Sequence, residues 1–179
     1  MGLLTIIRKQ KLKDKDLRII VLGLDNAGKS TIVHSLLGSP EDTKISPTLG
    51  FEIHSLQHKG YNLNFWDIGG QESIRAFWFN YFFDKFDCIV FVIDLITIRT
   101  RLNEIHQEFI KLLDNEKFEK TKFIIVLNKM DLFQEDQFDQ VKEEIIEKLQ
   151  LKRYIVEYEI VMVSGKTGRN VPGILDKIV

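Results

Sequence analysis

Residues 23–30 have the sequence GLDNAGKS, which fits the pattern G-x-x-x-x-G-K-[ST]. Glycines in this pattern allow backbone N–H groups to turn inward on a chain of phosphates. Lys29 can reach the β and γ oxygens, and Ser30 can offer its hydroxyl to Mg²⁺. The motif follows an apolar run and opens a helical pattern whose positive end points at the same anions. This context favours a nucleotide site over a chance match in a glycine-bearing turn.

The segment NKMD (128–131) follows the apolar run FIIVL and can select the base. Asp131 can accept hydrogen bonds from N1–H and the exocyclic amine of guanine, whereas adenine would leave the carboxylate unpaired. The Lys129 stem can lie along base and ribose, and Asn128 can tie the segment to the phosphate loop. A turn after a strand often has this composition, but here it follows a phosphate loop at a strand end, where ligands bind. The later segment SGKTG (164–168) can present a backbone N–H to the guanine oxygen.

Two segments between these motifs carry groups suited to a γ-phosphate. In WDIGGQE, Asp67 can hold Mg²⁺ through a water, Gly70 can give its N–H to the γ-phosphate, and Gln71 can orient the attacking water. In SPTLGFE, Thr48 supplies a hydroxyl that could cap Mg²⁺ only while a γ-phosphate is present. The combination predicts a site that distinguishes a nucleoside triphosphate from a diphosphate.

The elements that must position these residues are five apolar runs, at 17–23, 61–67, 88–94, 122–128 and 158–164. Continuous β-branched runs are typical of a parallel sheet that is covered on both faces. Helical patterns lie at 29–37, 99–114 and 138–149. The segments FEIHSLQ and YNLNFWD are joined only by HKG, which predicts an antiparallel hairpin at one sheet edge. The sequence therefore predicts an α/β fold with a mixed, mostly parallel six-stranded sheet and helices on both faces.

Composition bounds the class of protein. The 179 residues predict one domain, and 44 % hydrophobic with 28 % charged residues predicts a globular chain. A formal net charge of −1 gives no electrostatic reason to expect nucleic-acid binding. Four histidines and one cysteine exclude a zinc cluster of the usual sequence spacing, and Cys88 is expected to be a buried structural thiol. No apolar run approaches the about 18 residues that span a bilayer.

The order GLDNAGKST, SPTLGFE, WDIGGQ, NKMD and SGK resembles the ADP-ribosylation-factor (Arf) branch of small GTPases over nearly the whole chain. With the opening MGLLTI, the motifs are most similar to the Arf-like two type. The resemblance implies a P-loop NTPase small G domain over residues 17–179 and an N-terminal amphipathic helix over residues 1–16. It also implies GTP or GDP with Mg²⁺ as ligands, and a switch that hydrolyses GTP slowly and binds effectors in the GTP state.

The resemblance implies a role for each matching residue. Gln71 would be the catalytic residue. The metal would be held by Ser30, Thr48 and, through a water, Asp67. The effector-binding aromatics would be Phe51, Trp66 and Tyr81, although aromatics at such positions are more often core when judged from sequence alone. The nucleotide-binding set would be Gly23, Asp25, Asn26, Ala27, Gly28, Lys29, Ser30, Thr31, Thr48, Gly70, Asn128, Lys129, Asp131, Ser164, Gly165 and Lys166.

The same resemblance implies partners and a place in the cell. We expect effector proteins, a GTPase-activating protein and an exchange factor, no nucleic acid, and a monomer. The acylation motif that begins at Gly2 requires Ser or Thr where this chain has Ile6, so the expected membrane contact through the N-terminal helix is at most weak. A cytoplasmic protein with a minor membrane- or microtubule-associated pool is expected. Cargo trafficking or tubulin folding is the regulated process by analogy.

Charged residues in and after the phosphate loop are not explained by the motif. Asp25 lies in a loop whose ligand is anionic, so its side chain is expected to point outward along the rim. Arg99 and Arg101 are expected to be solvated helix charges, which leaves no arginine in cis for the transition state. Two alternatives stay open: a guanine-nucleotide scaffold that does not cycle, and a small-molecule phosphoryl-transfer enzyme. The pair Gln71 and Thr48 argues against the first, and the second lacks a recognisable acceptor site and arginine-bearing lid.

Overall fold

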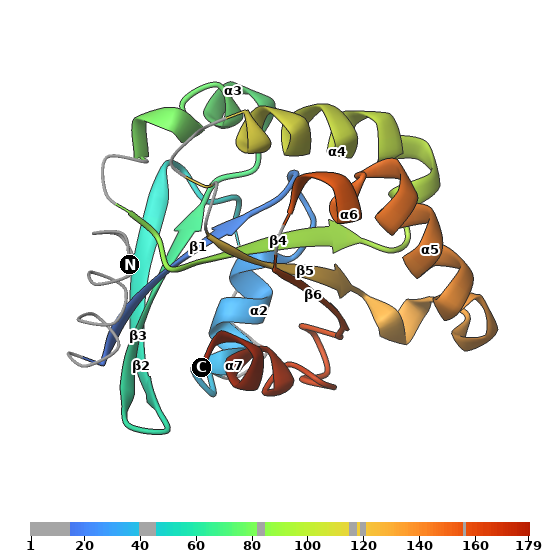
Figure 1. Ribbon diagram of the computed structural model, residues 1–179. Coiled ribbons are helices and arrows are strands. Elements are labelled where there is room, and N and C mark those ends of the chain that lie inside the picture. The colour runs from blue at the N-terminus through green and yellow to red at the C-terminus, as the bar shows by residue number, and fades with distance from the viewer. Residues whose placement is uncertain (1–14, 40–45, 82–84, 115–117, 119–120, 156) are drawn as a thin grey trace.

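The computed structural model describes residues 15–39, 46–81, 85–114, 118, 121–155 and 157–179. The described strands form a six-stranded sheet in the order β2-β3-β1-β4-β5-β6 (Figure 1). They are β1 (Asp16–Leu22), β2 (Phe51–His58), β3 (Tyr61–Ile68), β4 (Cys88–Asp94), β5 (Lys122–Asn128) and β6 (Tyr158–Met162). All neighbouring pairs are parallel except β2 with β3. The predicted mixed sheet with one antiparallel edge hairpin is therefore confirmed.

The edge hairpin turns through two residues of positive φ. Lys59 (φ 48°) and Gly60 (φ 80°) connect the paired residues His58 and Tyr61. Two left-handed residues twist the turn in the sense that matches paired strands, which is why glycine is suited to this place. The turn fixes a register that pairs Phe51 with Ile68 at the far end of the hairpin.

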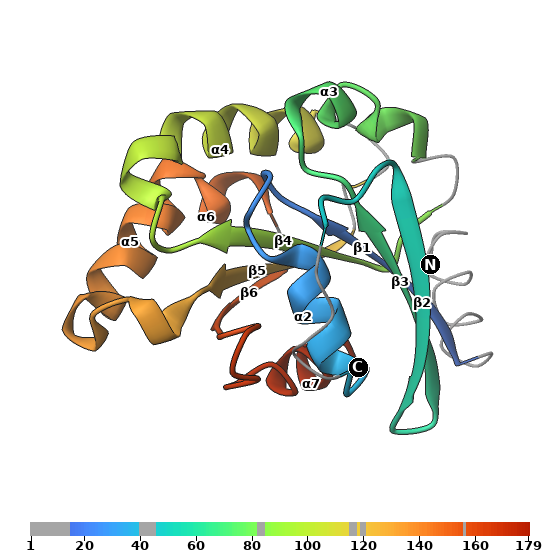
Figure 2. The same ribbon diagram turned by 180° about the vertical axis from the view of Figure 1, so that it is seen from behind.

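The helices cover both faces of the sheet, as Figures 1 and 2 show. Helices α4 (Ile98–Leu113), α5 (Phe138–Lys148) and α6 (Leu151–Tyr154) cover one face, and α2 (Lys29–Leu36) and α7 (Gly173–Ile178) cover the other. The three helices predicted from periodicity, α2, α4 and α5, are present within about two residues of their expected bounds. The other helical elements are too short to show a periodic pattern in the sequence: α3 (Glu72–Arg75), α6, α7, η1 (Trp78–Tyr81), η3 (Met130–Leu132) and η4 (Glu135–Gln137).

The two helical layers create two apolar cores because alternate strand residues point to opposite faces. Ile20 and Leu22 of β1 belong to the core under α4 and α5. Ile19 and Val21, their immediate neighbours, belong to the core under α2 and α7. Burial on both faces explains why β4 and residues 19–22 of β1 have no polar alternation, and the predicted burial of Cys88 is confirmed.

The ends of the chain bear on two sequence-based expectations. The predicted N-terminal helix (residues 1–16) lies almost wholly outside the described residues, which begin at Lys15. Among the helices described, none combines the length and the apolar character needed to cross a bilayer.

Candidate functional site

The phosphate loop connects the carboxyl end of β1 to the first residue of α2. Gly28 caps the helix with φ 89°, and a Cβ there would collide with the Asn128 side-chain amide. Gly23 has φ 145°, and a Cβ there would collide with the carbonyl oxygen of Val92 in β4. Both positions need glycine for two reasons: the backbone φ is positive, and a neighbouring group lies too close to leave room for a Cβ. The fold itself therefore explains the two motif glycines.

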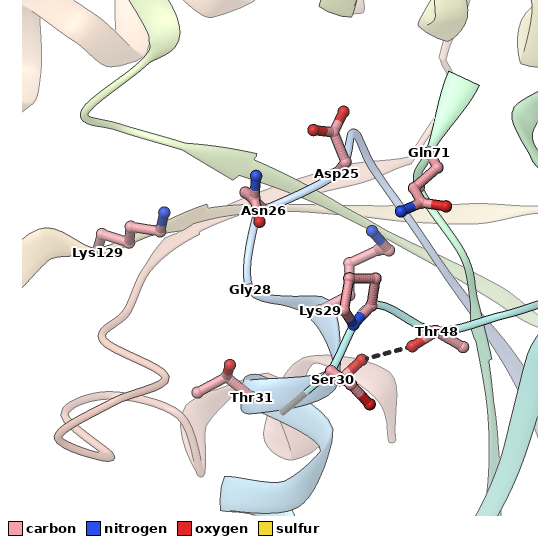
Figure 3. A pocket seen from close by; sticks show the side chains of 12 residues that line it. Asp25, Asn26, Gly28, Lys29, Ser30, Thr31, Thr48, Gln71 and Lys129 are labelled. Carbon is pink, nitrogen blue, oxygen red and sulfur yellow. Dashed lines mark hydrogen bonds between the residues drawn. The ribbon is translucent and has the colours of Figure 1, made fainter. Parts of the chain in front are cut away.

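A pocket of about 470 Å³ opens over this loop, a size within the range of nucleotide-sized ligands. Its lining combines the loop, the start of α2, the segment before β2, the segment after β3, and the residue after β5 (Figure 3). The lining residues are Asp25, Asn26, Gly28, Lys29, Ser30, Thr31, Ser46, Pro47, Thr48, Gly70, Gln71 and Lys129. The segments that follow β1, β3 and β5 and the segment before β2 all lie at the same edge of the sheet. Motifs separated by more than a hundred residues therefore share one pocket.

Three oxygen-bearing side chains converge below the pocket. The Ser30 Oγ lies 3.0 Å from the Thr48 Oγ1 and donates a hydrogen bond of 2.5 Å to Asp67 Oδ2. Asp67 is fully buried, and burial raises the pKa of its carboxyl, opposed by the Ser30 hydrogen bond and the Lys29 charge. Within the described residues its Oδ1 has no hydrogen-bond partner. Hydroxyl and carboxylate oxygens with one unsatisfied carboxylate atom are the donors that Mg²⁺ prefers.

Lys29 provides a buried cation at the floor of the pocket. Only 6 % of the residue is exposed, and its Nζ donates a 2.9 Å hydrogen bond to the Leu24 carbonyl. Burial lowers the Lys29 pKa to about 8, although Asp67 and Asp25 act in the opposite direction. A Cβ on Gly70 would collide with the Nζ, so the Gly70 backbone lies directly beside the ammonium group. An anion that enters here would compensate the desolvation of the lysine.

Asn128 links three loops through one buried side chain. Its Nδ2 donates to the Ala27 carbonyl at 2.8 Å, and its Oδ1 accepts from the Gly165 N–H at 2.9 Å. The residue is 2 % exposed. We call these two bonds the base-side tie, because they hold the phosphate loop to the NKMD and SGKTG segments.

The remaining residues expected to contact the base lie around this tie. Lys129 has φ 67° and pairs its Nζ with Asp94 Oδ2 at 2.7 Å. Asp131 is exposed, Ser164 is buried and accepts a 3.1 Å hydrogen bond from the Thr167 N–H, and Lys166 is exposed. Of the NKMD and SGKTG segments only Lys129 lines the pocket. Asp94 is a residue of the site region that the sequence analysis missed, since it ends a wholly apolar strand and shares no motif.

Asp25 points away from Lys29 and Ser30, along the rim of the pocket (Figure 3). Its Oδ1 accepts a 2.7 Å hydrogen bond from Arg101 Nη2, and its backbone carbonyl accepts one of 3.1 Å from Nη1. We call this fork the rim-side tie. The expectation that Arg101 is a solvated helix charge is therefore wrong, whereas Arg99 is exposed and bonds Gln137. Seventy-six residues separate Asp25 from Arg101, and sequence offers no signal for that contact.

The rim-side tie continues into a charged network under α3. Arg101 also bonds Glu104 at 2.8 Å, and Glu104 accepts a 2.6 Å bond from Arg75, which is 5 % exposed. Arg75 lies 3.3 Å from Glu108 as well. The arginines, Arg101 before Arg75, lower the pKa of Glu104 to about 2, and Arg101 lowers that of Asp25. The network connects the phosphate loop to the helix that begins directly after Gln71.

The expected effector aromatics fall on the hairpin and on η1. Phe51 is 42 % exposed and stacks on Trp66 with ring centroids 5.5 Å apart. Tyr81 ends η1, and its side chain lies outside the described residues. Several other large apolar side chains are exposed on these two segments or directly before them: Leu49, Ile53, Phe77 and Phe79.

A profile of the ADP-ribosylation factor family matches residues 3–179. The chain belongs to the ADP-ribosylation factor family. It is 43 % identical over 180 residues to ADP-ribosylation factor-like protein 2 of Dictyostelium discoideum, covering 100 % of this chain and 94 % of that protein. It is 48 % identical over 132 residues to ADP-ribosylation factor-like protein 2 of Drosophila melanogaster, covering 74 % and 70 %. ADP-ribosylation factor-like protein 3 of Chlamydomonas reinhardtii is 50 % identical over 133 residues, covering 74 % and 73 %.

A solved structure agrees with the Arf-family fold. It is the Arl6 BBS3 small GTPase from Trypanosoma brucei with the bound nucleotide analogue GppNp. The match has a TM-score of 0.73 at 24 % identity and covers 91 % of this chain and 95 % of that one. Membership of the Arf family makes this chain a small GTPase, which binds GTP or GDP with Mg²⁺ and hydrolyses GTP.

Proposed function

We propose that the pocket is the guanine-nucleotide site of an Arf-like switch that cycles between GDP and GTP and binds effectors in its GTP state. The observation that carries this proposal is the meeting of Ser30, Thr48 and Asp67 beside the buried Lys29. These residues come from three separate segments, and together they suit a magnesium-bound triphosphate better than any other ligand of this size.

Each pocket residue has a task in this proposal. Ser30 and Thr48 contribute hydroxyls to the metal, and Asp67 acts through a water. Lys29 and the Gly70 N–H bind the terminal phosphates, and the loop amides from Asp25 to Thr31 surround the others. When bound, Mg²⁺ neutralises charge that develops on the phosphate oxygens.

The base would lie at the opposite end of the pocket. Asp131 accepts from guanine, the Lys129 stem lies along base and ribose, and Asn128 keeps both segments in place. The Lys129–Asp94 ion pair supports this, because it holds the lysine ammonium while leaving the aliphatic stem free to contact a ring. In the SGKTG segment, Ser164 donates its N–H to the Arg169 carbonyl and Gly165 donates its N–H to the Asn128 side chain, so we assign the backbone N–H of Lys166 to the guanine oxygen.

Gln71 is the residue that we propose orients the attacking water. It lines the pocket, and its side chain lies near that of Lys29 (Figure 3). Replacing Gln71 with Leu is expected to lower single-turnover GTP hydrolysis by about tenfold or more while GTP stays bound. The matched control is Gln107→Leu on the exposed face of α4, which should hydrolyse at the unmodified rate. Multiple turnover of several per second by the unmodified chain without a partner would contradict the proposed slow switch.

We propose that effectors read the surface formed by β2 and the segment after α3. Phe51 and Trp66 form its stacked centre, and further large apolar side chains are exposed beside them, as is typical of a protein interaction site. The test is a pulldown with Gln71→Leu protein loaded with GTP against Thr31→Asn protein. Phe51→Ala should abolish the GTP-dependent fraction, and Tyr154→Ala on α6 should not. Capture that is equal for the two nucleotide states would favour a scaffold that does not cycle.

The cellular setting follows from the same proposal. A GTPase-activating protein is expected to raise the rate, because the rim-side tie holds Arg101 and, among the described residues, no arginine lines the pocket. An exchange factor is expected to complete the cycle by releasing GDP. We propose a monomer in the cytoplasm that regulates cargo trafficking or tubulin folding, by analogy with the Arf-like two type that its motifs resemble.

A further inference from the structure

Three potential metal ligands lie together where α2 meets the edge hairpin, outside the nucleotide pocket. His34 belongs to the last turn of α2, and Glu52 and His54 belong to β2. Because side chains alternate along a strand, the two β2 residues share one face. Leu56, on that same face, packs on the core under α2 and α7, so the face is turned toward His34.

The ligand atoms are close enough to share one ion. One ligand atom from each of the three residues lies within 4.8 Å of the other two, and His54 Nε2 is 3.2 Å from Glu52 Oε2. The rings of His34 and His54 are 5.6 Å apart and nearly edge to face. Neighbouring ligands in a tetrahedral zinc site are about 3.4 Å apart, so the histidine–glutamate distance already fits and a small rotation would bring in His34.

His34 carries an unsatisfied group that points to a ligand. Its Nδ1 is buried and has no hydrogen-bond partner among the described residues. A buried ring nitrogen without a partner costs free energy, and a metal ion would supply the missing interaction. The side chains of His54 and Glu52 are 22 % and 55 % exposed, so an ion can enter from solvent.

We propose that His34, Glu52 and His54 form a transition-metal site that binds Zn²⁺ or an ion of similar ligand preference. Two imidazoles and one carboxylate suit zinc, cobalt or nickel, whereas the oxygen donors of the nucleotide pocket suit magnesium. Three protein ligands leave one coordination position for water. The site joins the helix that carries Ser30 to the strand that begins just after Thr48, so an occupied site holds these two elements together.

That connection gives a consequence, which rests on the proposed function. In the described arrangement Thr48 lies beside Ser30, the arrangement expected when a γ-phosphate is present. A metal that stabilises β2 against α2 in this arrangement binds more tightly to the triphosphate form. Linkage is reciprocal, so the metal must raise the affinity for a triphosphate analogue by the same factor.

The direct test is titration of Zn²⁺ into the full chain loaded with GDP and excess Mg²⁺, in competition with a chromophoric chelator. One equivalent should bind, and Co²⁺ should give the visible absorption of a nitrogen- and oxygen-ligated ion. His34→Gln and His54→Gln should each weaken Zn²⁺ binding by about tenfold or more. The control is His106→Gln on α4, which should bind as the unmodified chain does, and retained GDP reports that each variant is folded.

Several outcomes would overturn the site. They are the absence of a stoichiometric Zn²⁺ site in the unmodified chain, equal affinity in all three histidine variants, and loss of affinity in His106→Gln alone. If His34→Gln does not fold, Glu52→Gln and His54→Gln on the accessible strand decide the question. Repeating the titration with a non-hydrolysable GTP analogue separates the two claims. Equal affinity in both nucleotide states would remove the linkage while leaving the site, and failure to bind any guanine nucleotide would contradict the proposed function instead.

Discussion

Two different kinds of interaction hold the phosphate loop, one at Ala27 and one at Asp25. On the side of the base, the base-side tie uses the neutral amide of Asn128, which is 2 % exposed and makes two short hydrogen bonds. On the side of α3, the rim-side tie uses the ion pair of Asp25 and Arg101, whose side chains are 36 % and 24 % exposed. The Asn128–Ala27 and Arg101–Asp25 bonds each bridge more than seventy residues of sequence, and only the second involves charged side chains.

The two ties differ in how strongly they depend on solvent, salt and neighbouring charges. Water does not reach the base-side tie, so its strength is insensitive to salt and its loss strands a buried donor and acceptor. The rim-side tie is accessible to solvent and screened by salt, and it is shared with the network below α3. The attachment of the loop at Ala27 is therefore fixed, whereas its attachment at Asp25 can respond to ions, partners and the position of α3.

Asn128→Ala is expected to have the largest effect on stability. It leaves the Ala27 carbonyl and the Gly165 N–H without their partner, which costs about 2–4 kcal/mol of the free energy of unfolding. Urea unfolding of the GDP-bound protein measures it, with Asn103→Ala on exposed α4 as the control. A cost equal to that of the control would show that the base-side tie does not support the loop.

The second prediction concerns the protonation of Lys29, whose ammonium group is buried at the floor of the pocket. Its pKa is lowered to about 8, so between about pH 8 and 10.4 the unfolded chain binds more protons than the folded one. The free energy of unfolding of the nucleotide-free protein should rise with pH across that window. Phosphates beside the ammonium raise its pKa, so GDP binding at pH 8 should take up about half a proton.

Calorimetry in buffers of different ionisation enthalpy measures this uptake. Lys29→Arg is the control, because the guanidinium stays protonated and uptake should vanish. Uptake that persists in Lys29→Arg would assign the proton to another group.

Arg75→Met examines the inner part of the charged network. Arg75 is 5 % exposed, but its partners Glu104 and Glu108 keep other cations, Arg101 and Lys111. The expected cost is about 1–2 kcal/mol, between that of an exposed pair and that of a fully buried one. Thermal unfolding measures it against Arg153→Met on α6, and no difference between the two would exclude a structural role for the network.

The rim-side tie itself should give the smallest effect. A double-mutant cycle of Asp25→Asn and Arg101→Gln is expected to show a coupling energy of about 0.2–1 kcal/mol that falls as salt increases. Because Arg101 lowers the pKa of Asp25, this contribution is present above the unfolded pKa and is lost as the pH falls through the lower folded value. Arg99→Gln in place of Arg101→Gln is the control. A salt-independent coupling energy of several kcal/mol would show instead that the rim-side tie is as strong and as well shielded as the base-side tie.

Much of the site could be predicted because its residues lie in contiguous motifs. The order of the motifs predicted Lys29, Ser30, Thr48, Gly70 and Gln71, and the structure brings all five to one pocket. The strands β4 and β5 were predicted at their exact bounds because burial on both faces produces continuous apolar runs. The partly exposed hairpin strands β2 and β3 were predicted within one residue because only the short segment HKG joins them. Arg101 was misjudged because a charge on a helix is usually solvated, and no local pattern announces a partner 76 residues away.

The sequence by itself determined the kind of ligand and the layered fold. Loop conformation, strand burial and helix periodicity are local properties, so a few residues at fixed spacing specify them. The tertiary structure alone decided which side chains from distant elements meet. The crossover helix α4 carries Arg101 to Asp25, and the packing of the hairpin on α2 carries Glu52 and His54 to His34. These contacts depend on how whole elements pack, and no spacing along the chain encodes them.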